Sequence, residues 1–179
     1  MAYVDFFADP KFVTNTDVDN ANLITALPLQ LASADVGLGA LRFQYDPGTP
    51  GGMRVLRYVK VHADSAAVAN GTPLMWTDTL QTTVSTVVAT GNRNFPAGVG
   101  IGTITAGNKG WIQCLGYHSA VITNGDDEIA KGDSVIYSAT DGKVDSVAAG
   151  TASTYKIVGI AAAADVDAAN TVATYINCI

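Results

Sequence analysis

The chain of 179 residues has few of the residue types on which most catalytic and metal sites depend. It contains two histidines, two cysteines and a single glutamate, Glu128. Long amphipathic helices place Glu and Lys on the face that meets solvent, whereas Asp, Asn and Gly favour turns. Because the acidic residues are almost all Asp and there are 18 glycines, the composition argues against a helical bundle and predicts a β-rich protein.

Basic residues and long apolar runs are also scarce. There are 10 Lys and Arg against 16 Asp and Glu, a formal net charge of −6, and nucleic-acid binding needs clustered positive charge. No apolar run approaches the roughly 20 residues of a membrane-spanning helix. Residues 1–9 carry two acids and no basic residue, so we expect no secretory signal and synthesis in a cytoplasm. The sequence predicts neither nucleic acid nor a membrane as a partner.

The two cysteines, Cys114 and Cys178, permit one disulfide without requiring it, and in a reducing compartment they would be small buried hydrophobes. Cys114 also lies four residues from His118, but on a strand this spacing separates them by about 13 Å, too far for a thiolate–imidazole contact. A zinc site built from Cys114, Cys178, His118 and His62 would have suitable ligand types. It would lack the closely spaced ligand pairs of structural zinc sites, so we do not expect one. An enzyme centred on Cys114 and His118 is therefore the less favoured alternative.

Two other clusters are better explained by structure than by ligand binding. The glycine-rich run 98–102 lacks the spacing of the dinucleotide fingerprint and of the P-loop, so its glycines indicate close strand packing or a bulge. The acidic group lacks the alternating ligands of an EF-hand and suits a solvated turn; its members are Asp126, Asp127, Glu128 and Asp133. We predict no cofactor and no metal ion.

One sequence motif occurs twice, at residues 69–79 and again 61 positions later at 130–140. Each copy has a glycine turn ahead of a short apolar run that ends in an aromatic and a small hydroxyl residue. This is the pattern of a turn that leads into a buried strand. The repeat predicts two β units of similar build that share or adjoin one core.

Residues 53–61 alternate with period 2, as expected for a strand with one drier face. Further strands are predicted at 82–90, which is rich in β-branched residues, and at 98–105, 111–121, 143–147, 155–161 and 171–179. About ten short strands with turns every 8 to 12 residues are typical of β-sandwiches and barrels. We therefore predict an all-β fold, in which residues 51–179 form a small β-barrel or β-sandwich body with an internal repeat.

Residues 1–50 lack sustained alternation, and the Pro- and Gly-rich stretch 46–52 is a strong loop signal, so we predict an extended N-terminal arm and loop region. Four aromatics fall within its first 12 residues, namely Tyr3, Phe6, Phe7 and Phe12. Aromatic side chains are costly to leave in water, so these four are expected either to pack on their own body or to dock on another chain. Trp76 and Trp111, by contrast, have apolar flanks and are expected in the core rather than in a carbohydrate platform.

The turn and strand motifs of residues 51–179 resemble the capsid decoration, or cement, proteins of tailed bacteriophages. The matching motifs are Arg54–Lys60, Ala69-x-Gly71-x-Pro73-Leu74, Gly98–Gly102, Gly107-x-x-Gly110-Trp111-Ile112, Ile129–Val144 and Val158–Ala161. The resemblance implies a structural virion protein, commonly a homotrimer and not an enzyme. It would bind the outside of an icosahedral capsid and stabilise it by bridging major capsid protein subunits. The four N-terminal aromatics would then contact the capsid or a neighbouring subunit. The alternative is a virion surface module that binds host carbohydrate.

Overall fold

The structure is a computed structural model, and it describes residues 37–45, 48, 50–87, 95–125, 128–153, 156–165 and 170–179. These residues form ten strands and no helix, so the prediction of an all-β fold is confirmed. The strands are β1 (Leu41–Tyr45), β2 (Met53–Val61), β3 (Pro73–Trp76), β4 (Thr83–Ser85), β5 (Pro96–Gly100), β6 (Lys109–Ile122), β7 (Ser134–Tyr137), β8 (Val144–Val147), β9 (Ile157–Ala161) and β10 (Thr171–Asn177).

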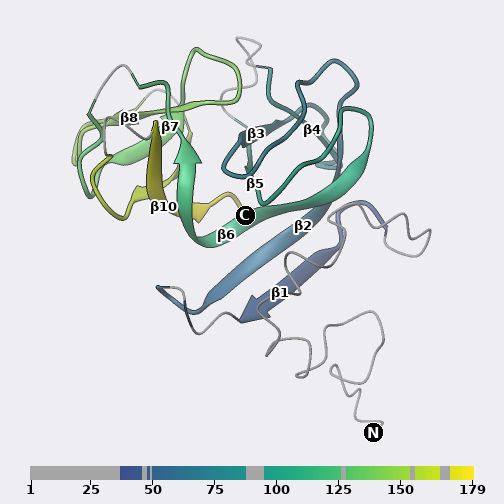
Figure 1. The fold of residues 1–179 in the computed structure, drawn as a ribbon, viewed down its shortest axis with the longest axis horizontal. Helices are drawn as coiled ribbons and strands as arrows, with labels where there is room; N and C mark the ends of the chain where they lie inside the picture. Colours follow the sequence, from purple (N-terminus) through teal and green to yellow (C-terminus); the bar gives the residue numbers. More distant parts are fainter. Residues whose placement is uncertain are drawn as a thin grey trace, which may run out of the picture.

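The strands close into two rings. In the first ring β2, β4, β3, β5 and β6 are neighbours in that order, and β2 also pairs with β6. In the second ring β6, β10, β9, β7 and β8 are neighbours in that order. A bridge from Thr123, directly after β6, to Val144 on β8 closes the second ring. The body is thus a tandem of two small barrels, seen as two lobes above the hairpin of β1 and β2 in Figure 1.

Strand β6 belongs to both barrels, because it is 14 residues long and changes partner halfway. Its residues from Lys109 to Leu115 pair with β2, and those from Leu115 to Ile122 pair with β10. Gly116 lies at the change of partner with φ +99°, and a Cβ there would be 2.4 Å from the carbonyl oxygen of Met53. Only glycine combines this backbone conformation with so close a contact. Figure 1 shows β6 running beneath both lobes.

The two copies of the repeated sequence motif, residues 69–79 and 130–140, have the same local structure. Gly71 and Gly132, both with positive φ, precede strands β3 and β7 of equal length. Strand β3 pairs with β5, and β7 pairs with β9. Each pairing is antiparallel and shifts register at the same point, after Leu74 in the first copy and after Val135 in the second.

A side chain closes the turn in each copy. In the first, the Ala69 N–H donates to Thr72 Oγ1 over 3.0 Å. In the second, the Ala130 N–H donates to Asp133 Oδ2 over 2.9 Å. A hydroxyl and a carboxylate therefore fill the same role, which explains why the turn survives although the residue type differs. Asp133 is a structural residue of this turn, since its other oxygen accepts from the Ala149 N–H over 3.0 Å.

Strand β2 contributes buried side chains on both of its faces, although Met53 and Lys60 are exposed. Val59 and Val61 belong to the core of the first barrel, while Leu56 and Tyr58 pack with Trp111 on the opposite face. The rings of Tyr58 and Trp111 lie 5.1 Å apart. The core of the second barrel is a separate cluster that includes Val121, Ile129, Val135, Tyr137, Val144, Val158, Val172 and Ile176.

Two segments differ from the sequence-based expectation. Strand β1 lies within residues 1–50, where no strand was predicted, and pairs along its whole length with β2. The run 98–105 was predicted as one strand, but strand β5 ends at Gly100. The chain turns there because Gly100 exchanges backbone hydrogen bonds with Gly71 and Thr72, and Ile104 then pairs with Val68.

Candidate functional site

The hairpin of β1 and β2 presents apolar side chains to solvent. Opposite residues of an antiparallel pair share a face of the sheet, and here Tyr45 is opposite Met53 while Phe43 is opposite Val55. Val55 is buried in the core, but Phe43, Tyr45 and Met53 are exposed, as is Leu41 on the same face. The hairpin therefore extends the sheet beyond the body and carries an uncovered apolar face.

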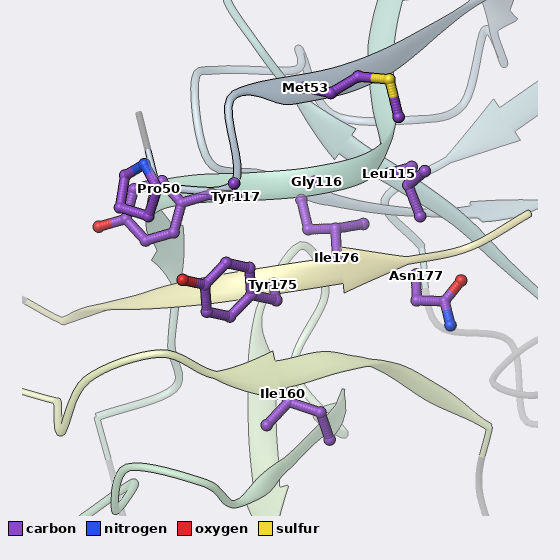
Figure 2. Close-up of a pocket in the computed structure, with 10 residues that line it drawn as sticks. Pro50, Met53, Leu115, Gly116, Tyr117, Ile160, Tyr175, Ile176 and Asn177 are labelled. Atoms are coloured by element: carbon purple, nitrogen blue, oxygen red, sulfur yellow. The ribbon is translucent and has the colours of Figure 1, made fainter. Parts of the chain in front are cut away.

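A groove of about 430 Å³ lies beside this hairpin. Its walls come from the turn before β2 and from strands β2, β6, β9 and β10, and Figure 2 shows the side chains that line it. The rings of Tyr117 and Tyr175 meet edge to face with centroids 5.5 Å apart. Gly116, where β6 changes from one barrel to the other, is part of the lining, so the groove lies where the two barrels join.

The hairpin face and the groove are continuous. Met53 belongs to both, and the ring of Tyr45 lies against Gly52 in the turn that borders the groove. We call the six exposed apolar residues of this region the hairpin–groove surface; they are Leu41, Phe43, Tyr45, Met53, Ile160 and Tyr175. Their exposed fractions lie between 41% and 64%.

The two strands of the hairpin also carry positive charge, and of their cations Arg57, opposite Leu41, lies on the apolar face. Strands β1 and β2 contain Arg42, Arg54, Arg57 and Lys60 and no acidic residue, although the whole chain has only 10 Lys and Arg. The guanidinium of Arg57 also lies over the ring of Trp76, 5.0 Å from its centroid. An apolar surface of this kind, with cations on the same strands, is suited to bind an apolar protein segment that carries negative charge.

The sequence contains a local signal for the first strand of this surface. Residues 41–45 read Leu-Arg-Phe-Gln-Tyr, which is strict alternation of apolar and polar residues. A turn-rich loop and a second alternating strand follow, as in a hairpin. The Pro- and Gly-rich stretch 46–52 is the stronger signal in the sequence, and it predicts that these five residues belong to the arm.

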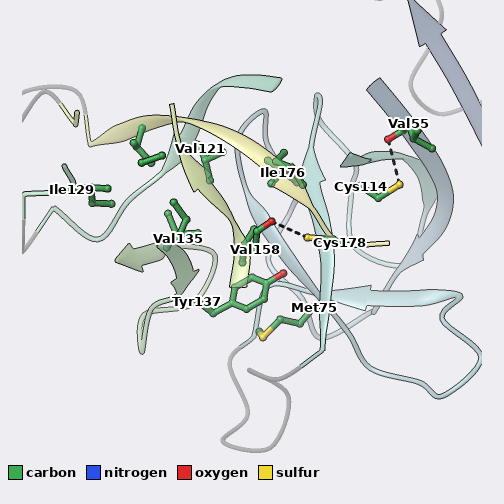
Figure 3. Packing of buried hydrophobic residues seen from close by; sticks show 14 residues of the cluster. Val55, Met75, Cys114, Val121, Ile129, Val135, Tyr137, Val158, Ile176 and Cys178 are labelled. Carbon is green, nitrogen blue, oxygen red and sulfur yellow. Dashed lines mark hydrogen bonds between the residues drawn. The ribbon is translucent and has the colours of Figure 1, made fainter. Parts of the chain in front are cut away.

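The residues considered for chemistry are held in unreactive forms. Burial raises the pKa of the Cys114 thiol to about 11 and that of Cys178 to about 12. Each thiol donates to a backbone carbonyl, Cys114 to Val55 over 3.3 Å and Cys178 to Val158 over 3.4 Å, and Figure 3 shows the two pointing apart. Both cysteines are free and buried, as predicted. Neither provides the thiolate that nucleophilic attack requires.

His118 is likewise buried, and its Nδ1 accepts a hydrogen bond from the Ala120 N–H over 3.2 Å. Burial, assisted by the positive charge of Arg54, lowers the pKa of His118 to about 4. The imidazole is therefore neutral near pH 7. It has the wrong environment to stabilise a thiolate at Cys114, and its role is that of a packed strand residue.

The tryptophans are buried, Trp76 in the first core and Trp111 against Tyr58, as expected from their apolar flanks. They provide no carbohydrate platform. Gly98 and Gly100, from the glycine-rich run, approach backbone carbonyls so closely that a Cβ would lie 2.3 Å and 2.4 Å from them, so they serve strand packing.

Within the described residues, His, Cys, Asp and Glu side chains nowhere gather in threes or more at a point where they could bind a metal ion. Asp126 and Asp127 lie outside this part of the chain. The described segments also contain no helix with the length and hydrophobicity needed to cross a bilayer. The predicted contact residues Tyr3, Phe6, Phe7 and Phe12 fall outside the described residues as well.

The fold is that of two small closed β-barrels in tandem with one shared strand. No protein-family model matches the chain, and no curated protein matches it. Among solved structures, the chain is similar to the N base of head fiber gp8.5 in bacteriophage phi29, with 17% sequence identity and a TM-score of 0.46. The match covers 70% of this chain and 96% of that chain.

Proposed function

We propose that this protein is a structural virion protein that binds the outer surface of an icosahedral phage capsid. It stabilises the capsid by bridging major capsid protein subunits, and it acts as a homotrimer without a cofactor or catalytic activity. Within this proposal Tyr3, Phe6, Phe7 and Phe12 contact the capsid or a neighbouring subunit.

The hairpin–groove surface is the observation that carries the proposal. Its six exposed apolar residues lie on strands and beside a tight turn, so they are held in place by the barrels rather than by a loop. Soluble monomers rarely expose contiguous apolar surface of this kind, and such surfaces mark sites of protein association. A role in assembly uses this surface directly.

Two further features support an assembly role. The sequence motifs that resemble cement proteins lie at the turns and strands of both barrels, including the paired glycine turns. The candidate nucleophile Cys114 and the neutral His118 are buried as part of the core, which leaves a rigid body suited to binding. Many moderate contacts repeated over symmetric copies produce strong attachment without one dominant site.

The proposal is tested on purified virus particles. Mass spectrometry should detect the chain in particles in multiple copies, and particles stripped of it should rupture at lower temperature than intact ones. Adding back the purified protein should restore the rupture temperature. The proposal fails if the chain is absent from particles, or if adding it back leaves their stability unchanged.

A further inference from the structure

We propose that the hairpin–groove surface of one subunit binds the aromatic N-terminal segment, residues 1–13, of a neighbouring copy of this chain. The inference rests on the proposed homotrimer and assigns its intersubunit contact. It makes the four N-terminal aromatics the partner of a defined surface on the body.

The two parts are chemically complementary. Residues 1–36 contain five Asp and one Lys, a net charge of −4, and the segment within them carries four aromatic side chains. Strands β1 and β2 carry four cations and no acid, and the surface they help to form is apolar. Opposite charges steer such partners together, and apolar contact between the aromatics and the groove holds them.

The geometry of the groove suits aromatic rings. Tyr117 and Tyr175 already meet edge to face at one side of it, so a ring from another chain would extend an existing aromatic cluster. Aromatic pairs favour this arrangement and gain from it beyond the burial of area. Ile160 and Met53 provide apolar contact on the remaining sides, as Figure 2 shows.

The length of the chain allows the segment to reach another subunit. Residues 14–36 separate the segment from Gly37, where the described structure begins close to β1. A chain of this length spans up to about 75 Å when extended, at roughly 3.3 Å per residue. This exceeds the width of a small barrel domain.

Symmetry favours this contact over one between two hairpins. A contact that joins two different parts of the same chain is heterologous and closes into a ring under threefold rotation. If two hairpins met directly, the contact would bring Arg57 of each apolar face toward the other and would bring together two strand pairs that each carry four cations and no acid, at a cost in like-charge repulsion. The acidic segment removes this conflict.

Cross-linking of mixed subunits tests the contact directly. A Phe6→Cys variant is labelled with a maleimide benzophenone while native Cys114 and Cys178 remain buried and react slowly. Labelled ¹⁴N protein is mixed with unlabelled ¹⁵N protein, dissociated by dilution, reassociated and irradiated. Cross-links between the isotopes at residues 41–53 or 160–175 are expected. Cross-links confined to single copies, or spread over the rest of the body, overturn the proposal.

Light scattering on the purified protein provides the second test. Deletion of residues 2–13, or Phe43→Ser on the exposed hairpin face, should raise the concentration for half-dissociation at least tenfold. The control Leu80→Ser removes an exposed apolar side chain elsewhere and should leave it unchanged. Raising NaCl from about 50 mM to 500 mM should weaken association, because screening shortens the range of the charge attraction.

A wild-type protein that is monomeric at all concentrations overturns the inference, as does equal dissociation by Phe43→Ser and Leu80→Ser. Circular dichroism establishes that each variant is folded. These measurements involve no virus particles, so a failed inference leaves the proposed virion role standing, and absence from particles would refute that role separately.

Discussion

At the scale of single residues, burial decides what the few ionisable side chains can do. The two thiols and His118 are kept in their neutral forms because water is excluded from them. From sequence alone Cys114 and His118 looked like the one possible reactive pair. Their separation on a strand argued against it, and the structure adds that neither group is in a reactive state.

His118 should make stability depend on pH. Its pKa is about 4 in the folded protein and about 6.5 when unfolded, so the unfolded state binds more protons between these values. The contribution is fully present above pH 6.5 and is lost as the pH falls to about 4, on the order of 3 kcal/mol in total. Urea unfolding at pH 7.5, 6, 5 and 4 measures this loss.

The His118→Asn variant keeps an acceptor for the Ala120 N–H but has no proton to bind, so its stability should fall less over the same pH range. The exposed His62→Asn is the matched control. If the His118→Asn profile has the same slope as that of the wild type, His118 is not the group that titrates.

At the scale of elements, the duplicated unit shows which parts of a turn are fixed and which are free. Residue 71 or 132 must be glycine for its backbone conformation, while the next residue needs only an acceptor oxygen, supplied by Thr72 or Asp133. The surroundings of the two glycines differ. A Cβ on Gly71 would lie 2.1 Å from the carbonyl oxygen of Ala120, whereas a Cβ on Gly132 would have no atom within 4 Å.

The two equivalent glycines therefore predict different costs for the same substitution. Gly132→Ala should destabilise by about 1–2 kcal/mol, the cost of a positive φ for a residue with a Cβ. Gly71→Ala should cost more, because the backbone at Ala120 must also shift. Chemical denaturation of both variants measures the difference, and equal costs would show that the contact with Ala120 yields without strain.

Some of the strands could be predicted from the sequence and others could not. The repeat, the alternation at 53–61 and the glycine turns predicted the strands well because each depends on local pattern. The shared use of β6 could not be predicted, since it depends on which distant strand pairs with each half. The hairpin face was missed because Leu41, Phe43 and Tyr45 precede a loop that looked like the end of an arm.

At the scale of the whole molecule, the shared strand makes two barrels one cooperative unit. Removing either barrel would expose half of β6, and the cluster that contains Cys114 and Cys178 draws residues from both sides of the junction. Trp76 and Trp111 lie in the first barrel, while Val158 lies in the second. A change that destabilises one barrel should therefore also shift an unfolding signal that comes from the other.

Val158→Ala should shift the unfolding transition seen by tryptophan fluorescence as much as the transition seen by far-UV circular dichroism, at a cost of about 2 kcal/mol. Val84→Ala, equally buried in the first barrel, is the matched variant and should behave alike. A tryptophan transition that stays in place when Val158 is changed would show that the barrels unfold independently.

The position of β1 at the edge of the sheet affects how the protein behaves while no partner covers it. Among the described strands it pairs on one side only, with β2, so its other side offers backbone groups to any extended chain that approaches. Strands of this kind promote aggregation, and natural proteins guard them with charge. Arg42 lies within β1, and Arg54 lies on β2 opposite Gln44, one strand in from this edge, so two copies that approach along the edge bring like charges together. Under the proposed function, the arginines would thus limit aggregation of subunits that have not yet bound a capsid.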